Sequence, residues 1–339
     1  MCVNLLEIHP SLVLLDALSW RQRAIFYGIL ALVFLATNPA LLLPDTINYL
    51  IAYATEQTLT HHGYFMMGHL YPNNVSDTPG GTPIYFYVLY LLVKTPLPIL
   101  AAMLAGLIII FKKRREPGPF FLSLMFLMWI VPYSIVGAKW LRYTLSLMPI
   151  IYIIGAIGIV KLFDLLAGLV KERTNPVFRR ALVAAFVLLF FLAPLWSAAR
   201  SAPFYSLYLN PLGFGRIAYF FPHDEIYDVG LRETIKQICR EAVPEASVGG
   251  ESSSVFRYYF DKFGRNDLRY FNLSDPAERT AALSSAYVVV QDGRKYFENI
   301  SLIEAIESRY RPAVVTMIRD AVVARVYRVE NLAQLRQPK

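Results

Sequence analysis

Hydrophobic residues are concentrated in the first part of this chain. Between residues 24 and 199, long apolar runs alternate with short charged clusters, whereas residues 200–339 mix polar and apolar positions as a soluble domain does. About 20 apolar residues cross a bilayer as a helix. Runs that reach or approach this length cover residues 24–43, 119–138, 143–169 and 181–197. They predict membrane-spanning helices.

A further run, residues 83–111, is longer and carries Lys94, Pro96 and Pro98 near its middle. Proline removes a main-chain donor and clashes with the preceding turn of a helix. We therefore expect either one kinked span or a short half-helix followed by a span, with the break near Lys94 and Pro96.

After residue 200, helix and strand patterns alternate. Helical spacing covers residues 230–242, 252–263 and 295–310. Strand patterns cover residues 246–249, 268–272, 287–291, 313–317 and 321–329. This order predicts a small, largely parallel sheet that ends in a hairpin. The fold class expected is a mainly α membrane protein, with about five transmembrane helices followed by a small α/β domain.

Charge gives this arrangement an orientation. Only 17% of the 339 residues are charged, and the net charge is +8. Lys and Arg favour cytoplasmic loops, and three basic clusters flank the apolar runs: Arg21, Arg23, Lys112, Lys113, Arg114, Arg115, Lys171, Arg173, Arg179 and Arg180. If all three are cytoplasmic, residues 1–23 lie inside, the bundle covers 24–199, and both the loop 44–82 and the domain 200–339 lie outside.

This topology predicts a multi-pass protein of the plasma or inner membrane with an extracytoplasmic C-terminal domain. Cys2 and Cys239 would lie on opposite sides of the membrane, so no disulfide is expected. No basic patch with interleaved aromatic residues stands in a soluble setting, so nucleic acid is not an expected partner. Membrane lipids are.

Three histidines, His61, His62 and His69, lie close together in the outer loop. No carboxylate or cysteine is suitably spaced among them to complete a metal site. They are expected either to make ordinary hydrogen bonds in an aromatic interfacial helix or to contact a phosphate or sugar at the membrane face.

Basic residues also occur outside the predicted cytoplasmic loops, where Lys and Arg are less common. Lys94 lies inside an apolar run, where a charge is expensive and marks a functional candidate unless it snorkels to the interface. Lys139 and Arg142 form a short outer turn beside Trp140 and Tyr143. They are expected to bind lipid head groups or the phosphate of a lipid-linked substrate.

Several motifs follow one another in a recognisable order. His61-His62-Gly63-Tyr64 comes first, and Thr82-Pro83-Ile84-Tyr85-Phe86-Tyr87 leads into Val93-Lys94-Thr95-Pro96-Leu97-Pro98. Lys139-Trp140-Leu141-Arg142-Tyr143 precedes Met148-Pro149, and Tyr208-Leu209-Asn210 opens the outer domain. This order resembles the C-terminal half of the phospholipid-carrier-dependent glycosyltransferases, the dolichyl-phosphate-mannose–protein mannosyltransferase-like enzymes of the GT-C fold.

The resemblance implies transfer of a sugar from a polyprenyl-phosphate donor to an acceptor on the outer membrane face, as in protein glycosylation. It implies Lys94, Lys139 and Arg142 as ligands of the donor phosphate, and His61, His62 and His69 as further substrate-binding residues. It also implies an acidic residue that serves as a base or as partner of a divalent metal ion.

The sequence departs from the family in its first outer loop. Asp45 and Glu56 lie there, but not in the setting of the family's acidic motif, so no catalytic residue is assigned. The family's earlier spans do not precede this loop. We therefore expect a truncated gene product, one half of a split enzyme with a partner subunit, or a non-catalytic relative.

Two other functions compete with a sugar transferase. One is a non-catalytic, membrane-anchored binding module whose outer α/β domain recognises a glycan or a protein. The other is a transporter, which needs several polar groups facing a cavity at the membrane midplane. Apart from Lys94, the apolar runs offer almost none.

Overall fold

The structure is a computed structural model that describes residues 19–54, 62–170, 175–222 and 228–328. The chain divides into two compact units, and each is treated by itself below. Unit 1 comprises residues 1–60, 101–132 and 145–183, and unit 2 comprises residues 61–100, 133–144 and 184–339.

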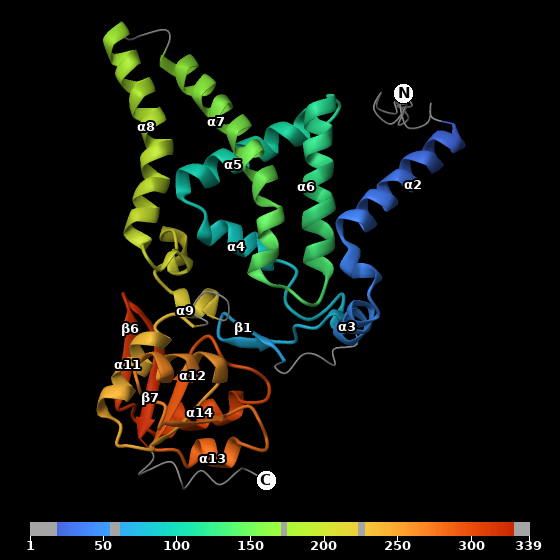
Figure 1. Cartoon of the computed structure of the whole chain (residues 1–339). Coiled ribbons are helices and arrows are strands. Elements are labelled where there is room, and N and C mark those ends of the chain that lie inside the picture. Colours follow the sequence, from blue (N-terminus) through green and yellow to red (C-terminus); the bar gives the residue numbers. More distant parts are fainter. Residues whose placement is uncertain (1–18, 55–61, 171–174, 223–227, 329–339) are drawn as a thin grey trace. The chain divides into compact units, whose positions relative to one another are not determined.

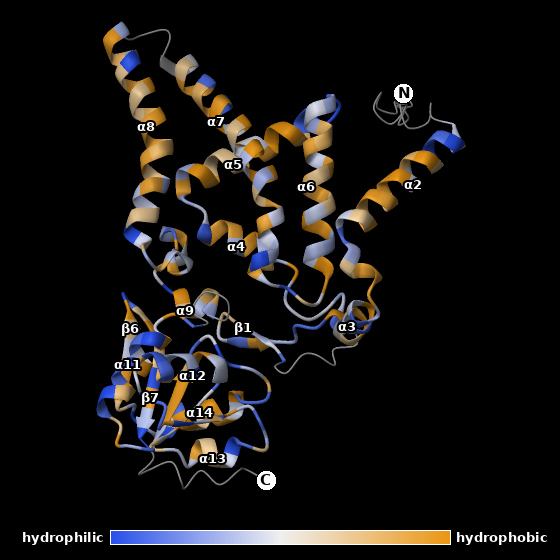
Figure 2. Cartoon of the chain, viewed as in Figure 1, coloured by the Kyte–Doolittle hydropathy of each residue, from blue (hydrophilic) through white to orange (hydrophobic). Residues whose placement is uncertain are grey.

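Helices dominate the chain up to residue 201 (Figure 1). They are α2 (Trp20–Thr37), α3 (Pro44–Ala54), α4 (Phe86–Lys94), α5 (Leu97–Lys112), α6 (Pro117–Ile135), α7 (Met148–Val170) and α8 (Pro176–Ser201), with the short 3₁₀ turns η1 (Pro39–Leu42), η2 (Val75–Asp77) and η3 (Leu141–Ser146). Figure 2 shows that apolar residues run along most of α5, α6, α7 and α8.

Among the described residues, three helices are long and apolar enough to cross a bilayer: α6, α7 and α8. They coincide with the predicted runs 119–138, 143–169 and 181–197. The apolar helix α5 is shorter, at 16 residues. Three helices therefore have the length and composition of membrane spans, while the number of spans stays a prediction.

Two glycines allow α5 and α7 to touch within unit 1. A Cβ at Gly106 would lie 1.9 Å from the main-chain oxygen of Ile154, and a Cβ at Gly158 would lie 1.8 Å from that of Ala102. Small residues at such positions let helix backbones approach closely in a membrane, where packing rather than the hydrophobic effect drives association.

The predicted break in the run 83–111 is confirmed. Helix α4 ends at Lys94 and α5 begins at Leu97, with Pro96 between them. Pro96 has no N–H to offer the main-chain oxygen of Leu92, the acceptor one turn back. The side-chain amide of Asn210 replaces that donor, at 2.6 Å from the Leu92 oxygen and 2.7 Å from the Thr95 oxygen.

The histidine segment of the loop 44–82 contains a β-hairpin, so the expected interfacial helix is wrong. Strand β1 (Tyr64–Met66) pairs antiparallel with β2 (His69–Tyr71). The two residues between them, Met67 and Gly68, both have positive φ, as the tightest hairpin turns require. The sequence signal is the glycine at the second turn position, a residue that adopts positive φ without strain.

The C-terminal part of unit 2 holds a five-stranded sheet in the order β4-β3-β5-β7-β6. Its strands are β3 (Ser247–Gly250), β4 (Arg269–Asn272), β5 (Tyr287–Gln291), β6 (Val314–Ile318) and β7 (Ala321–Arg328). Strand β3 is parallel to β4 and β5, whereas β7 is antiparallel to both β5 and β6. The predicted small sheet with a final hairpin is confirmed, but the sheet is mixed rather than largely parallel, because two of its four strand pairings are antiparallel.

Helices accompany this sheet: α11 (Leu231–Glu241), α12 (Ser253–Lys262), α13 (Arg279–Leu283) and α14 (Ile300–Arg309). Alternation along β5 separates two cores. Val289 is buried with residues of α11 and α12, whereas Val288 and Val290 are buried with Ile303 and Ile306 of α14. The predicted helix 295–310 begins later than expected, at Ile300.

A short irregular segment follows α8. It contains η4 (Tyr205–Leu207), η5 (Pro211–Gly213) and α9 (Ile217–Phe220). Leu207 is buried in a small cluster with Ile318 and Val323 of the β6–β7 hairpin. The segment is thereby attached to the α/β domain, while Asn210 attaches it to α4.

Candidate functional site

A cavity of about 630 Å³ lies within unit 2, where the end of α8 and the start of α5 come together with the segment after α8 and with the β6–β7 turn. One part of its wall is apolar and belongs to two apolar helices, with Leu97 from α5 and Ala193 and Trp196 from α8. Ligand pockets combine such apolar walls with a few polar groups that orient the ligand.

The polar part of this wall carries charge. Arg200 comes from the last turn of α8, and Arg319 and Asp320 come from the β6–β7 turn. The Arg319 guanidinium donates to the main-chain oxygen of Ala202 at 3.2 Å, which places it beside the end of α8. Two guanidinium groups next to an apolar wall favour a ligand with an anionic head and a hydrocarbon tail.

Lys94 lies beside this cavity. Its ammonium donates to the main-chain oxygen of Ser206 at 2.6 Å, and Ser206 directly precedes the lining residue Leu207. Asn210, which also lines the cavity, is 2% exposed, and its main-chain N–H donates to the Val93 oxygen at 2.9 Å. The end of α4 and one wall of the cavity are therefore held together.

Lys139 is fully buried in the turn between α6 and η3. Its ammonium donates to the main-chain oxygens of Thr82 at 2.6 Å and Val136 at 2.5 Å, and its main-chain N–H donates to the Asn73 side chain at 2.6 Å. Burial lowers the pKa of Lys139 to about 8. With these bonds Lys139 connects the segment before α4 to the turn after α6.

Arg142, in η3, is exposed and lies over the ring of Trp140, with its guanidinium carbon 4.6 Å from the ring centroid. Trp140 in turn meets the ring of Tyr64 edge-to-face. Tyr64 also packs against Phe86 at the start of α4. These aromatic contacts join the hairpin, α4 and the turn after α6 within unit 2.

The predicted histidines do not form a cluster. The Nδ1 of His62 contacts a carboxylate oxygen of Glu298 in the α/β domain, and the His62 main-chain N–H donates to the same carboxylate at 3.1 Å. The ring of His69 is exposed and packs on Tyr71. His61 lies outside the described residues.

The predicted site residues thus fall into separate places: Lys94 at the cavity, Lys139 and Arg142 at the turn after α6, and His62 against the α/β domain. Asp45 lies in the first turn of α3, and Glu56 is outside the described residues. No group of three His, Cys, Asp or Glu able to hold a metal ion occurs in the part of the chain that the structure describes.

Polar side chains also gather where the parallel strands of the α/β domain end. Glu251 follows β3 and is 3% exposed, and it accepts from Ser274 at 2.6 Å and from Asn299 at 2.7 Å. Burial raises the pKa of Glu251 to about 7. Arg294, after β5, donates to Asp228 at 2.9 Å.

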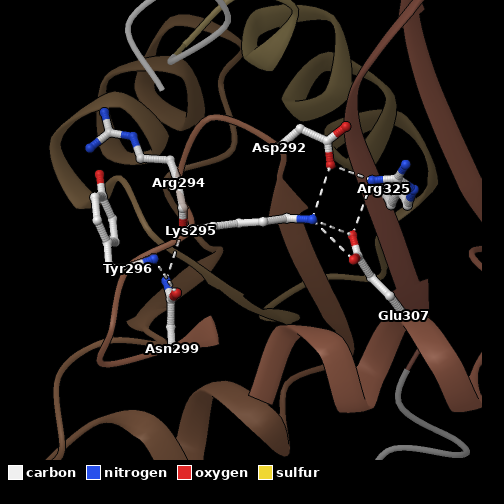
Figure 3. Close-up of polar contacts among 7 residues, drawn as sticks. All are labelled: Asp292, Arg294, Lys295, Tyr296, Asn299, Glu307 and Arg325. Atoms are coloured by element: carbon white, nitrogen blue, oxygen red, sulfur yellow. Dashed lines mark hydrogen bonds and ion pairs between the residues drawn. The ribbon is translucent and has the colours of Figure 1, made fainter. Parts of the chain in front are cut away.

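A second charged network, drawn in Figure 3, lies in the same domain. The Lys295 ammonium lies 3.0 Å from Glu307 and 3.7 Å from Asp292, and Arg325 contacts both carboxylates. Because the two cations meet two carboxylates, the network balances its own charge. This leaves little reason for it to attract a further ion.

Sequence reasoning missed Arg200, Arg319 and Glu251. Arg200 ends a long apolar run, and Arg319 with Asp320 forms the turn between two strand patterns. Each of these positions is common in proteins and does not by itself indicate a binding site. The cavity depends on contacts between residues more than 100 positions apart, such as Arg319 with Ala202. Asn210 was recognised as part of a motif, but not as the partner of the break at Pro96.

A comparison with known protein families finds a match to the mainly helical part of the chain. The model of the Alg9-like mannosyltransferase family matches residues 3–208. No curated protein and no solved structure matches the chain. The match includes the α4–α5 break, Lys94 and the end of α8, and it agrees with the expectation of a GT-C-type glycosyltransferase. This chain belongs to the Alg9-like mannosyltransferase family.

Proposed function

We propose that this membrane glycosyltransferase takes its sugar from a polyprenyl-phosphate donor, whose phosphate is held by Arg200 and Arg319 in the cavity of unit 2. One observation carries the proposal: apolar side chains of α5 and α8 and two guanidinium groups line the same cavity. A lipid phosphate presents the matching combination of an isoprenoid chain and an anion.

The chemistry of transfer uses this charge. The acceptor hydroxyl oxygen attacks the anomeric carbon, and the bond from that carbon to the phosphate oxygen breaks. Polyprenyl phosphate leaves with the electron pair, so negative charge on the phosphate increases. Guanidinium groups fixed beside the leaving phosphate stabilise this charge as it develops. The leaving group therefore gains more from Arg200 and Arg319 than the bound donor does.

The acceptor must lose a proton, and a carboxylate is the simplest base. Asp320 is the carboxylate among the described residues that line the cavity. We therefore assign Asp320, which follows Arg319 directly in the β6–β7 turn, as the base that accepts the proton of the acceptor hydroxyl. This assignment needs no metal ion, although a divalent cation bound to the phosphate is compatible with it.

The predicted site residues receive different roles in this proposal. Lys94 supports the cavity through Ser206 and adds positive charge beside the phosphate. Lys139 shapes the outer turn, because its ammonium is already bonded to two main-chain oxygens. Arg142, His62 and His69, together with His61, are proposed to contact the acceptor or lipid head groups.

The basic segment between α5 and α6 indicates how the chain is oriented in the membrane. It contains Lys112, Lys113, Arg114 and Arg115, which favour the cytoplasm. Five crossings would then place the cavity and the α/β domain outside, where lipid-linked sugars serve as donors without nucleotides. This topology rests on the charge pattern, together with the length and apolar composition of α6, α7 and α8.

Sugar transfer tests the proposal. Membranes containing the full chain are incubated with a radiolabelled polyprenyl-phosphate mannose and with a nucleotide-linked mannose. We expect transfer from the lipid-linked donor alone, at least tenfold reduced by Arg200→Gln and by Asp320→Asn. Arg232→Gln, at an exposed arginine of α11 outside the cavity, is the matched control. Transfer from the nucleotide sugar, or equal loss in the control, overturns the proposal.

A non-catalytic binding module gives a different result. Such a protein would bind the lipid-linked sugar without transferring it. Donor binding that persists in Asp320→Asn while transfer is lost supports catalysis, because a carboxylate base acts on the acceptor and leaves donor contacts in place.

A further inference from the structure

The segment after α8 presents an apolar tip. Phe214 has a left-handed backbone conformation, with φ of 49°, and is 81% exposed. Gly215 follows with φ of 69°. Leu212, two residues earlier, is 45% exposed. Residues 211–216 form this tip, named the 214 loop below, and it projects two large apolar side chains.

The base of the 214 loop is firmly held. Asn210 donates to main-chain oxygens of Leu92 and Thr95, and it accepts from the Leu212 N–H at 2.9 Å. Leu207 is buried against the β6–β7 hairpin. A loop anchored on both α4 and the α/β domain has a defined position, so the exposure of Phe214 is a property of the fold.

Helix α8, which is long and apolar enough to cross a bilayer, ends shortly before this loop, at Ser201. Helix α8 carries exposed apolar side chains along its last turns, including Leu195 at 64% and Trp196 at 69%. Arg200 and Arg216, on either side of the segment, are both exposed. Aromatic side chains with nearby cations are typical of the membrane–water interface, where rings enter the head-group region and cations meet lipid phosphates.

We propose that the 214 loop inserts Leu212 and Phe214 into the outer leaflet, with Arg216 at the lipid phosphates. Apolar side chains of interfacial segments enter about 5–10 Å into the boundary between head groups and acyl chains. The last turns of α8 and the 214 loop line the same cavity, and this shared position beside an apolar helix argues for the bilayer as the partner of the loop.

Insertion has a consequence for the cavity, and this part rests on the function proposed above. Pro211 and Gly215 of the 214 loop line the cavity. A loop that both lines the cavity and enters the leaflet opens the cavity toward the lipid. A polyprenyl-phosphate donor then reaches Arg200 laterally from the leaflet, with its chain remaining in the bilayer.

Depth-dependent fluorescence quenching tests the insertion. Cys2 and Cys239 are replaced by Ser, Phe214→Cys is introduced, and an environment-sensitive fluorophore is attached in nanodiscs made of mixed neutral and anionic lipids. We expect blue-shifted emission that nitroxide lipids quench, more strongly with the nitroxide near the head group than near the chain end. Val243→Cys, at a 67% exposed apolar site between α11 and β3, is the control and should emit as in water.

Water-like, unquenched emission at position 214 in a correctly folded sample overturns the insertion. Folding is checked by a single symmetric peak in gel filtration and by unchanged thermal unfolding. Failure of the proposed function is distinguishable, because donor binding in detergent involves no leaflet. Quenching at 214 without donor binding contradicts the function alone, whereas donor binding without quenching contradicts the insertion alone.

Discussion

The side-chain amide of Asn210 occupies the place of the donor that Pro96 cannot provide, 2.6 Å from the main-chain oxygen of Leu92. Inside or near a membrane, an unsatisfied main-chain group is costly, so a broken helix needs a partner from elsewhere in the protein. Here that partner comes from a segment more than 100 residues away. The break that separates α4 from α5 is thus joined to one wall of the cavity.

Asn210→Asp should destabilise the protein although it keeps the size and shape of the side chain. The carboxylate donates no hydrogen bond, which leaves the Leu92 and Thr95 oxygens without this donor, at about 1–3 kcal/mol for each group. The midpoint of thermal unfolding in detergent measures the effect. Asn266→Asp, at an exposed position of the α/β domain, should change it little. Equal midpoints for the two variants would contradict this role of Asn210.

Gly158→Leu should disrupt the contact between α5 and α7. Even a Cβ at Gly158 would lie 1.8 Å from the Ala102 oxygen, so the helices must separate. Overpacking of this kind costs about 1–3 kcal/mol or more. Gly155→Leu, on the same helix, is the control, because a Cβ at that position would have no atom of another element within 4 Å. A larger loss of thermal stability in the control would show that this packing is wrong.

Lys139 should make stability depend on pH above neutrality. Its pKa is about 8 in the folded protein and 10.5 as its ordinary value, so the unfolded chain binds more protons between these pH values. Stability relative to Lys139→Met therefore rises with pH in this window, by at most about 1.4 kcal/mol per pH unit. Thermal midpoints of both proteins from pH 7 to pH 10 measure the difference. A constant difference would mean that Lys139 keeps its ordinary pKa.

Glu251 should act in the opposite direction. Its pKa of about 7 lies above the ordinary 4.5, so the folded protein binds more protons between these values and loses stability as pH rises. Glu251→Gln removes the buried charge and can still bond Ser274 and Asn299. We expect the variant to be more stable than wild type at pH 8 and similar at pH 5, in full-length protein unfolded by heat. A variant less stable than wild type at pH 8 would contradict the claim that burial raises the pKa of Glu251.

The sequence predicted those features that depend on periodicity and on single strong residues. Apolar runs indicated α6, α7 and α8, Pro96 indicated the break, and alternation indicated the strands of the sheet. The hairpin at residues 64–71 was not predicted, because a segment with three histidines and several aromatic residues is typical of an interfacial helix. The positive φ of Met67, which indicates the turn, is visible only in the structure.

The candidate site was less predictable for a physical reason. Arg200, Arg319 and Asn210 belong to three segments whose proximity is decided by tertiary packing, and the sequence around each one does not indicate the other two. Lys94 was predicted as a site residue because a charge inside an apolar run is conspicuous. Lys139 was equally conspicuous, but the sequence did not indicate that main-chain oxygens of Thr82 and Val136 would surround its ammonium.

Discrimination between a lipid phosphate and its neutral alcohol tests the central claim most directly. Binding of polyprenyl phosphate and of the matching polyprenol is measured on the full chain in detergent, for wild type, for Arg200→Gln with Arg319→Gln, and for Arg232→Gln. We predict that wild type and Arg232→Gln bind the phosphate at least tenfold more tightly, and that the double variant binds both lipids alike. Retained preference for the phosphate in the double variant would contradict the account.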